Sequence, residues 1–87
     1  VKAALFAVGA GRIGNYDHCC FESRGKGQFR PLEGSNPTFG EKHQLEVVDE
    51  LKVELVCEDS LYDSVIQALL DSHPYETPAY YAIKTLG

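Results

Sequence analysis

The 87-residue sequence lacks methionine and tryptophan, and it is short of basic residues: eight Lys and Arg stand against thirteen Asp and Glu. A formal charge of -5 without a Lys/Arg cluster argues against a nucleic-acid partner, because such binding depends on basic contacts to phosphates. No apolar run approaches the roughly 20 residues that cross a bilayer, and no signal-peptide pattern is present. These absences predict a cytoplasmic protein without nucleic-acid or membrane partners.

Cysteine is also scarce, and its three copies make no disulfide framework. Cys19 and Cys20 are adjacent and would point to opposite faces of a strand, which fits a reducing compartment. The composition is otherwise globular, with 44% hydrophobic and 24% charged residues, so we expect one domain over residues 1–87. A domain this small buries little surface alone, which favours an oligomer.

Glycine is concentrated in short runs, of which the most distinctive is Gly9-Ala10-Gly11-Arg12-Ile13-Gly14. These letters spell G-x-G-x-x-G, the fingerprint of a dinucleotide-binding turn, which requires a strand before it and a helix after it. Residues 1–8 instead favour the last turns of a helix, and residues 15–23 are poor in helix formers. The flanks therefore predict a helix that ends at glycine, not a nucleotide site.

Strand patterns appear in the middle and at the end of the chain. Residues 16–23 and 28–32 have strand-like composition, and residues 45–57 alternate apolar and polar side chains, as in a half-buried strand. Residues 79–85 predict a final strand that carries two tyrosines.

A second helix is indicated between these strands. Residues 60–63 resemble a capping box, and Pro74 predicts the helix end. Two rows of apolar residues repeat at helical spacing between them: Leu61, Val65 and Leu69, and Tyr62, Ile66 and Leu70.

These elements predict an α+β domain. Because the sequence has no methionine and starts within a helix pattern, we expect a first strand to be missing from it. With that strand added, the order is βαββαβ: a ferredoxin-like antiparallel sheet with both helices on one face.

Two histidine-containing segments could carry chemistry. In residues 73–76, His73 and Glu76 could act as a ligand pair or an acid–base couple, or the two flanking prolines could simply stiffen a connection. In residues 18–20, His18 and Cys20 would face one side of a strand and Cys19 the other, so a metal site needs copies from a symmetric oligomer. Cys19 could also act as a nucleophile paired with His43 or His73.

The loop from Gly34 to Gly40 could form an anion-binding nest of backbone N–H groups. A run this long without regular structure is uncommon in a small domain unless it binds something. Four basic residues in or before this glycine-rich region indicate an electropositive pocket: Arg12, Arg24, Lys26 and Arg30.

Four motifs occur in an order and spacing that resemble a known family. They are residues 9–19 (GAGRIGNYDHC), 27–31 (GQFRP), 33–37 (EGSNP) and 73–76 (HPYE). Together they resemble the domain inserted into Nif-three-like proteins of the YqfO type, and small free-standing bacterial proteins that consist of that domain.

The resemblance implies a CutA/PII-like ferredoxin fold that assembles as trimers. It implies no metal ligands, because the dinuclear site of the longer proteins lies in a flanking domain without counterpart here. We therefore expect a regulatory or small-ligand-sensing or metal-sensing domain without catalysis of its own. The alternatives are a protein that binds a divalent metal through His and Cys at a subunit interface, or a small enzyme that uses Cys19 or His73 with Glu76.

The expected site lies where the Gly9–Tyr16 turn, the Gly34–Gly40 loop and residues 73–76 meet, within one chain or between subunits. The expected ligand-binding residues are Arg12, Asn15, Tyr16, Asn36, His73 and Glu76. The expected metal ligands are His18, Cys19 and His73.

Overall fold

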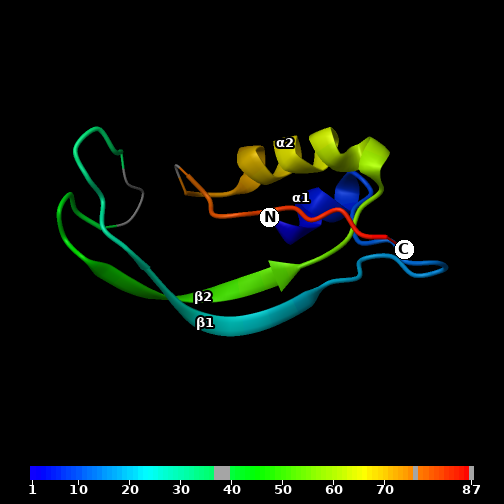
Figure 1. Ribbon diagram of the computed structural model, residues 1–87, viewed down its shortest axis with the longest axis horizontal. Helices are drawn as coiled ribbons and strands as arrows, with labels where there is room; N and C mark the ends of the chain where they lie inside the picture. The colour runs from blue at the N-terminus through cyan, green and yellow to red at the C-terminus, as the bar shows by residue number, and fades with distance from the viewer. Residues whose placement is uncertain (37–39, 76, 87) are drawn as a thin grey trace.

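The computed structural model describes residues 1–36, 40–75 and 77–86. Its elements are, in chain order, α1 (Lys2–Ala7), β1 (Phe21–Phe29), β2 (Glu46–Glu54), the 3-10 turn η1 (Asp59–Leu61) and α2 (Tyr62–Ser72). β1 and β2 form an antiparallel hairpin, and both helices lie on one face of it, toward one end (Figure 1). Two strands and two helices make this a small α+β domain, as the sequence predicts.

The core is small and lies where the helices meet the end of the hairpin. Leu5 of α1, Ala10 and Val65 of α2 are buried, and Leu55 and Leu69 are among the partly buried residues packed against them. The row formed by Leu61, Val65 and Leu69 therefore faces the core as predicted, whereas Tyr62 and Leu70 are exposed. No helix among the described residues is both long enough and apolar enough for a bilayer crossing.

Helix α1 ends as the glycines predict. The N–H of Gly9 donates to Phe6 O and that of Ala10 to Leu5 O, and Gly9 has a φ of 100°, which favours glycine. After Gly11 the chain makes a tight turn closed by paired bonds between Ile13 and Tyr16, and no helix follows. The structure thus lacks the strand-then-helix context of a dinucleotide site.

Helix α2 ends as predicted but begins differently. His73 is extended, with a ψ of 134°, because the following Pro74 disfavours the helical region. The predicted capping box is wrong: η1 precedes the helix, Ser60 lies inside it, and the N-cap is Leu61 without a side-chain cap bond. A 3-10 turn supplies the start instead, with the N–H of Leu61 donating to Glu58 O.

The bounds of the first described strand also need correction. The strand expected at residues 16–23 begins at Phe21 and runs through Gly25 and Gly27 to Phe29. Gly27 lies opposite Val48, and a β-carbon there would collide with the Glu50 carboxylate that crosses it. Gly27 therefore makes room for a cross-strand side chain, and neither glycine breaks the strand. β2 is shorter than the predicted 45–57 at both ends.

The predicted half-buried face of β2 is largely exposed. Val47, Leu51 and Val53 are 56%, 53% and 39% exposed, and only the following Leu55 and Cys57 reach the core. The reason is length: α1 has six residues and α2 eleven, so they cover one end of the hairpin.

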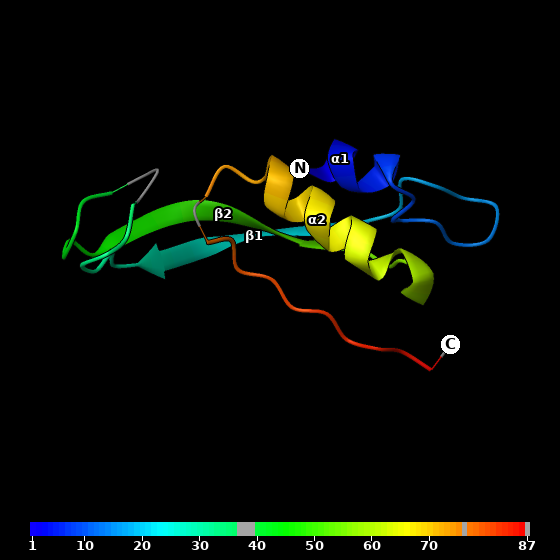
Figure 2. The ribbon, with the colours of Figure 1, turned by 90° about the horizontal axis from the view of Figure 1, so that it is seen from above.

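The final strand expected at residues 79–85 is absent from the described structure: the segment forms no ladder. The segment is extended and runs in the same direction as β2 (Figures 1 and 2). Tyr81 and Ile83 are 72% and 74% exposed. A strand must share backbone hydrogen bonds with a neighbour, and no described strand forms a ladder with this segment.

Candidate functional site

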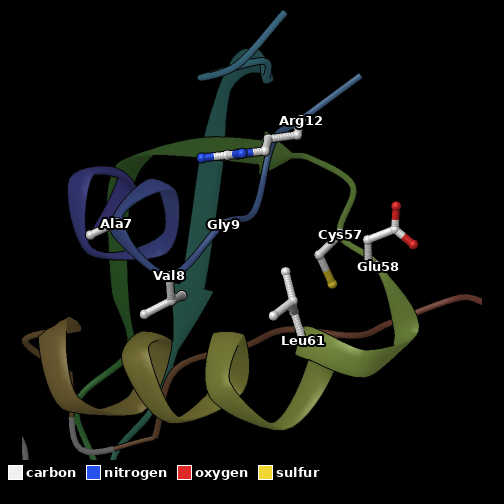
Figure 3. Close-up of a pocket in the computed structure, with 7 residues that line it drawn as sticks. All are labelled: Ala7, Val8, Gly9, Arg12, Cys57, Glu58 and Leu61. Atoms are coloured by element: carbon white, nitrogen blue, oxygen red, sulfur yellow. The ribbon is translucent and has the colours of Figure 1, made fainter. Parts of the chain in front are cut away.

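A shallow pocket lies between the glycine turn that follows α1 and the connection from β2 to α2. Its volume is about 540 Å³. Figure 3 shows the Leu61 side chain and the Cys57 thiol directed toward its interior, and the Glu58 carboxylate directed away. It is lined by Ala7, Val8, Gly9, Arg12, Cys57, Glu58 and Leu61.

Gly11 holds the two walls of this pocket together. Its N–H donates to Val56 O at 2.7 Å, and its own carbonyl accepts from Cys19 N at 2.8 Å. A β-carbon on Gly11 would lie 2.8 Å from Cys19 O and 2.8 Å from the Phe6 ring, and its φ is 78°. The G-x-G-x-x-G letters therefore serve close packing between the helix end, the loop and the exit of β2.

Arg12 supplies the positive charge of the pocket. Its side chain is exposed at the rim and forms no ion pair with any described residue. Val8 and Leu61 supply apolar lining, with the Cys57 thiol beside them, whereas Arg12 and Glu58 supply polar lining. A guanidinium at the rim of a pocket that includes Val8 and Leu61 suits a small molecule that combines an anionic group with an apolar part.

The loop after the glycine turn holds the predicted metal ligands His18 and Cys19. The His18 ring packs on Phe6 with centroids 4.7 Å apart, and its Nδ1 lies 3.3 Å from Asp17 Oδ1. The Cys19 thiol donates to Asp17 O at 3.6 Å. Among the described residues of one chain, no three His, Cys, Asp or Glu side chains are grouped for a metal ion. A metal here would need ligands from further copies.

His73 lies at the opposite end of α2 from the pocket. Its Nδ1 accepts a hydrogen bond from the Tyr75 N–H at 3.1 Å, and the two rings meet edge-on with centroids 4.9 Å apart. Because Nδ1 accepts, the proton of the neutral ring sits on Nε2, whereas a histidine ligand usually donates its second nitrogen to a partner. The contact supports the structural interpretation of this segment; its other predicted member, Glu76, lies outside the described residues.

The other candidates are spread along the molecule. Arg12, Asn15 and Tyr16 lie at the helix end, whereas Asn36 lies at the tip of the β1–β2 hairpin, in a molecule 46 Å long (Figure 1). At that tip His43 Nε2 lies 2.9 Å from Glu33 Oε1. Within one chain neither His43 nor His73 contacts the Cys19 thiol, which already donates to a carbonyl.

Sequence reasoning found Arg12 but missed Cys57 and Leu61. Cys57 was visible as the last apolar position of the alternating pattern, and Leu61 as the first position of the helical row. These patterns predict only a core position for both residues, because nothing local shows that the end of β2 meets the glycine turn.

Known proteins of similar sequence are much longer. No family model matches the chain. A Bacillus subtilis protein named GTP cyclohydrolase 1 type 2 homolog is 50% identical over 80 residues, which are 92% of this chain and 21% of that protein. A Halalkalibacterium halodurans protein of the same name is 49% identical over 80 residues, 92% of this chain and 22% of that protein. The chain thus spans about a fifth of the length of the curated relatives it matches.

A solved structure agrees with these relatives. The crystal structure of a Bacillus cereus protein related to NIF3 matches with a TM-score of 0.74 and 45% identity, over 90% of this chain and 19% of that one. Residues 1–87 are therefore a domain-sized α+β unit that recurs within much longer bacterial proteins. Those relatives and the solved neighbour are NIF3-related, YqfO-type proteins, and residues 1–87 match one domain within them. The resemblance inferred from the four sequence motifs is confirmed.

Proposed function

We propose that residues 1–87 form a non-catalytic regulatory domain of CutA/PII-like, ferredoxin-like type that binds a small anionic ligand. The observation that carries the proposal is the Arg12 guanidinium, without an ion-pair partner among the described residues, at the rim of a pocket of mixed polar and apolar lining. The remaining nucleophile and base candidates are engaged locally: the Cys19 thiol with Asp17 O and His73 with Tyr75 N–H. A sensing role needs binding only, which this pocket can supply.

The proposal includes assembly as a homo-oligomer, with a trimer as the expected form. The support is the large share of apolar surface that one chain leaves exposed, including Phe21 at 66%, Val47 at 56% and Leu51 at 53%. In the longer relatives, whose name refers to GTP cyclohydrolase, a domain of a fifth of the length would act as an accessory to the rest. Copies brought together could also place residues from the hairpin tip beside those of the glycine turn.

The test is titration of the chain with inorganic phosphate and, separately, with GTP, followed by amide shifts in NMR spectra. We expect saturable shifts at Gly9, Gly11 and Cys57 with at least one of these probes. An Arg12→Gln variant should weaken binding about ten- to a hundredfold, because a hydrogen bond to a charged group contributes about 1.5–3 kcal/mol. The matched control is Arg24→Gln, whose guanidinium lies on β1, away from the pocket.

Three results would count against the proposal. The absence of saturable shifts with either probe contradicts the ligand site, and equal losses in the Arg12 and Arg24 variants contradict the role of Arg12. A sedimentation mass equal to one chain contradicts the oligomer. Bound divalent metal near one ion per chain in untagged protein, lost in His73→Ala, would favour the metal alternative instead.

A further inference from the structure

Two side chains at the pocket carry opposite charges without neutralising each other. Arg12 and Glu58 both line the pocket, and neither forms an ion pair with any described residue. Figure 3 shows the guanidinium and the carboxylate pointing away from each other. Both residues are exposed, so the pocket offers one cation and one anion to a ligand that arrives from solvent.

The charges next to these two side chains are compensated. Asp59 follows Glu58 in the chain, but its Oδ2 lies 3.2 Å from Lys84 Nζ, so this carboxylate has a cation of its own. The backbone dipoles at the pocket oppose each other, because the C-terminal end of α1 and the N-terminal end of η1 both line it. The local charge that a ligand meets is therefore that of Arg12 and Glu58, which sum to zero.

This balance of charges favours a ligand with a single negative charge. One anionic group gains the hydrogen bonds of Arg12, whereas each further negative charge finds no second cation in the lining and is repelled by Glu58. A lining carboxylate acts on a ligand even when it points outward, because screening takes about 8 Å at physiological salt. The formal charge of -5 on the whole chain adds to this repulsion.

The rest of the lining indicates the uncharged part of the ligand. Val8 and Leu61 supply apolar surface, and Figure 3 shows the Leu61 side chain directed toward the interior. A short branched hydrocarbon chain would cover this surface. A planar carboxylate at its end would pair with the Arg12 guanidinium through two parallel hydrogen bonds and would bring only one charge.

We propose that Glu58 is a specificity-determining residue that restricts the pocket to monocarboxylates with a short apolar chain and rejects ligands with several negative charges. Arg12 holds the ligand, whereas Glu58 excludes competitors. The inference rests on the ligand site proposed above and names the class of ligand that this site takes.

The test compares five probes on the same chain by NMR amide shifts: isocaproate, its uncharged amide, acetate, inorganic phosphate and GTP. Isocaproate should bind about tenfold more tightly than its amide, which lacks the charge that Arg12 recognises. It should also bind about tenfold more tightly than acetate, which lacks the hydrocarbon that Val8 and Leu61 would cover. Inorganic phosphate and GTP should both bind more weakly than isocaproate, because they bring more than one negative charge.

A Glu58→Gln variant isolates the role of Glu58. It removes the charge and keeps the size, and the bond from the Leu61 N–H goes to the backbone carbonyl of residue 58, so the start of η1 is retained. The affinity for GTP should rise about fivefold or more and that for isocaproate by less than about twofold, because Coulomb repulsion grows with the charge of the ligand. The matched control is Glu50→Gln on β2, outside the pocket lining, which should change neither affinity by more than about twofold.

Three results would overturn the inference, and they are distinguishable from one another. Phosphate or GTP that binds as tightly as isocaproate contradicts the ligand class but leaves the anion site proposed above standing. Equal effects of Glu58→Gln and Glu50→Gln on GTP binding, or equal effects of Glu58→Gln on GTP and isocaproate, contradict the role of Glu58 alone. If no probe gives saturable shifts, the ligand site itself is absent and the inference fails with it.

Discussion

The glycine turn after α1 and the outer half of the β1–β2 hairpin are both rich in glycine, but they use it in opposite ways. Gly11 is buried, is bonded to both Val56 and Cys19, and has no room for a β-carbon. In the exposed strand β1, nothing lies near the β-carbon position of Gly25, and only the flexible Glu50 side chain lies near that of Gly27. Glycine is therefore required for close backbone packing in the turn, whereas in the hairpin no backbone packing requires it. The role of a glycine motif thus depends on its contacts.

The strongest test of this difference between the two regions is to add a methyl group at Gly11. Gly11→Ala should lower the free energy of unfolding by about 2–4 kcal/mol, because it adds both left-handed backbone strain and a clash with Cys19 O and the Phe6 ring. Urea denaturation followed by circular dichroism would measure this loss.

Gly14→Ala is the matched control. Gly14 also has a positive φ, 56°, but nothing lies within 4 Å of its β-carbon position. It should therefore lose only the conformational part, about 1 kcal/mol. Equal losses at the two positions would mean that close packing at Gly11 does not matter.

The second prediction compares two valines, one from each region. Val65 of α2 is 6% exposed and Val47 of β2 is 56% exposed. Val65→Ala should lower the free energy of unfolding by about 2 kcal/mol through lost burial and a cavity, whereas Val47→Ala should change it by less than about 0.5 kcal/mol. The same denaturation experiment tests both. A large loss at Val47 would show that its face of the hairpin is covered in solution.

The features that sequence predicted correctly are local ones. The end of α1 at Gly9 and the end of α2 before Pro74 depend on residues a few positions apart. Both helix ends can therefore be predicted from the local sequence. The glycine turn is local in the same sense, because Gly9 and Gly11 adopt positive φ angles that favour glycine.

The predictions that were wrong depend on contacts between residues far apart in the sequence. β1 continues through Gly27 because Glu50, on the other strand, occupies the space above it. Residues 79–84 remain outside the sheet because a strand needs a neighbour, which propensity cannot supply. In the site, Arg12 was predictable from charge, but Cys57 and Leu61 join it only through the bond from Gly11 to Val56.

The smallest predicted effect concerns two lysines that tie elements together in the two regions. A hydrogen bond to Glu22 raises the pKa of Lys2 and links α1 to β1. A hydrogen bond to Glu54, on the same strand, is the main cause that raises the pKa of Lys52; the further effect of Tyr81 links β2 to the C-terminal segment, residues 79–84. A raised lysine pKa stabilises the fold below the ordinary value of about 10.4, and this contribution is lost as pH rises through the folded value.

Tyr81→Phe should lower the pKa of Lys52 toward its ordinary value and leave that of Lys2 unchanged, because Tyr81 is among the causes of the shift only at Lys52. NMR titration of the lysine side-chain carbons would show both values in one experiment. Glu54→Gln should lower the pKa of Lys52 as well, so it serves as a positive control. If Lys52 responds to Glu54→Gln but not to Tyr81→Phe, the C-terminal segment does not stay beside β2 in solution, and the region that remains organised is the helix end alone.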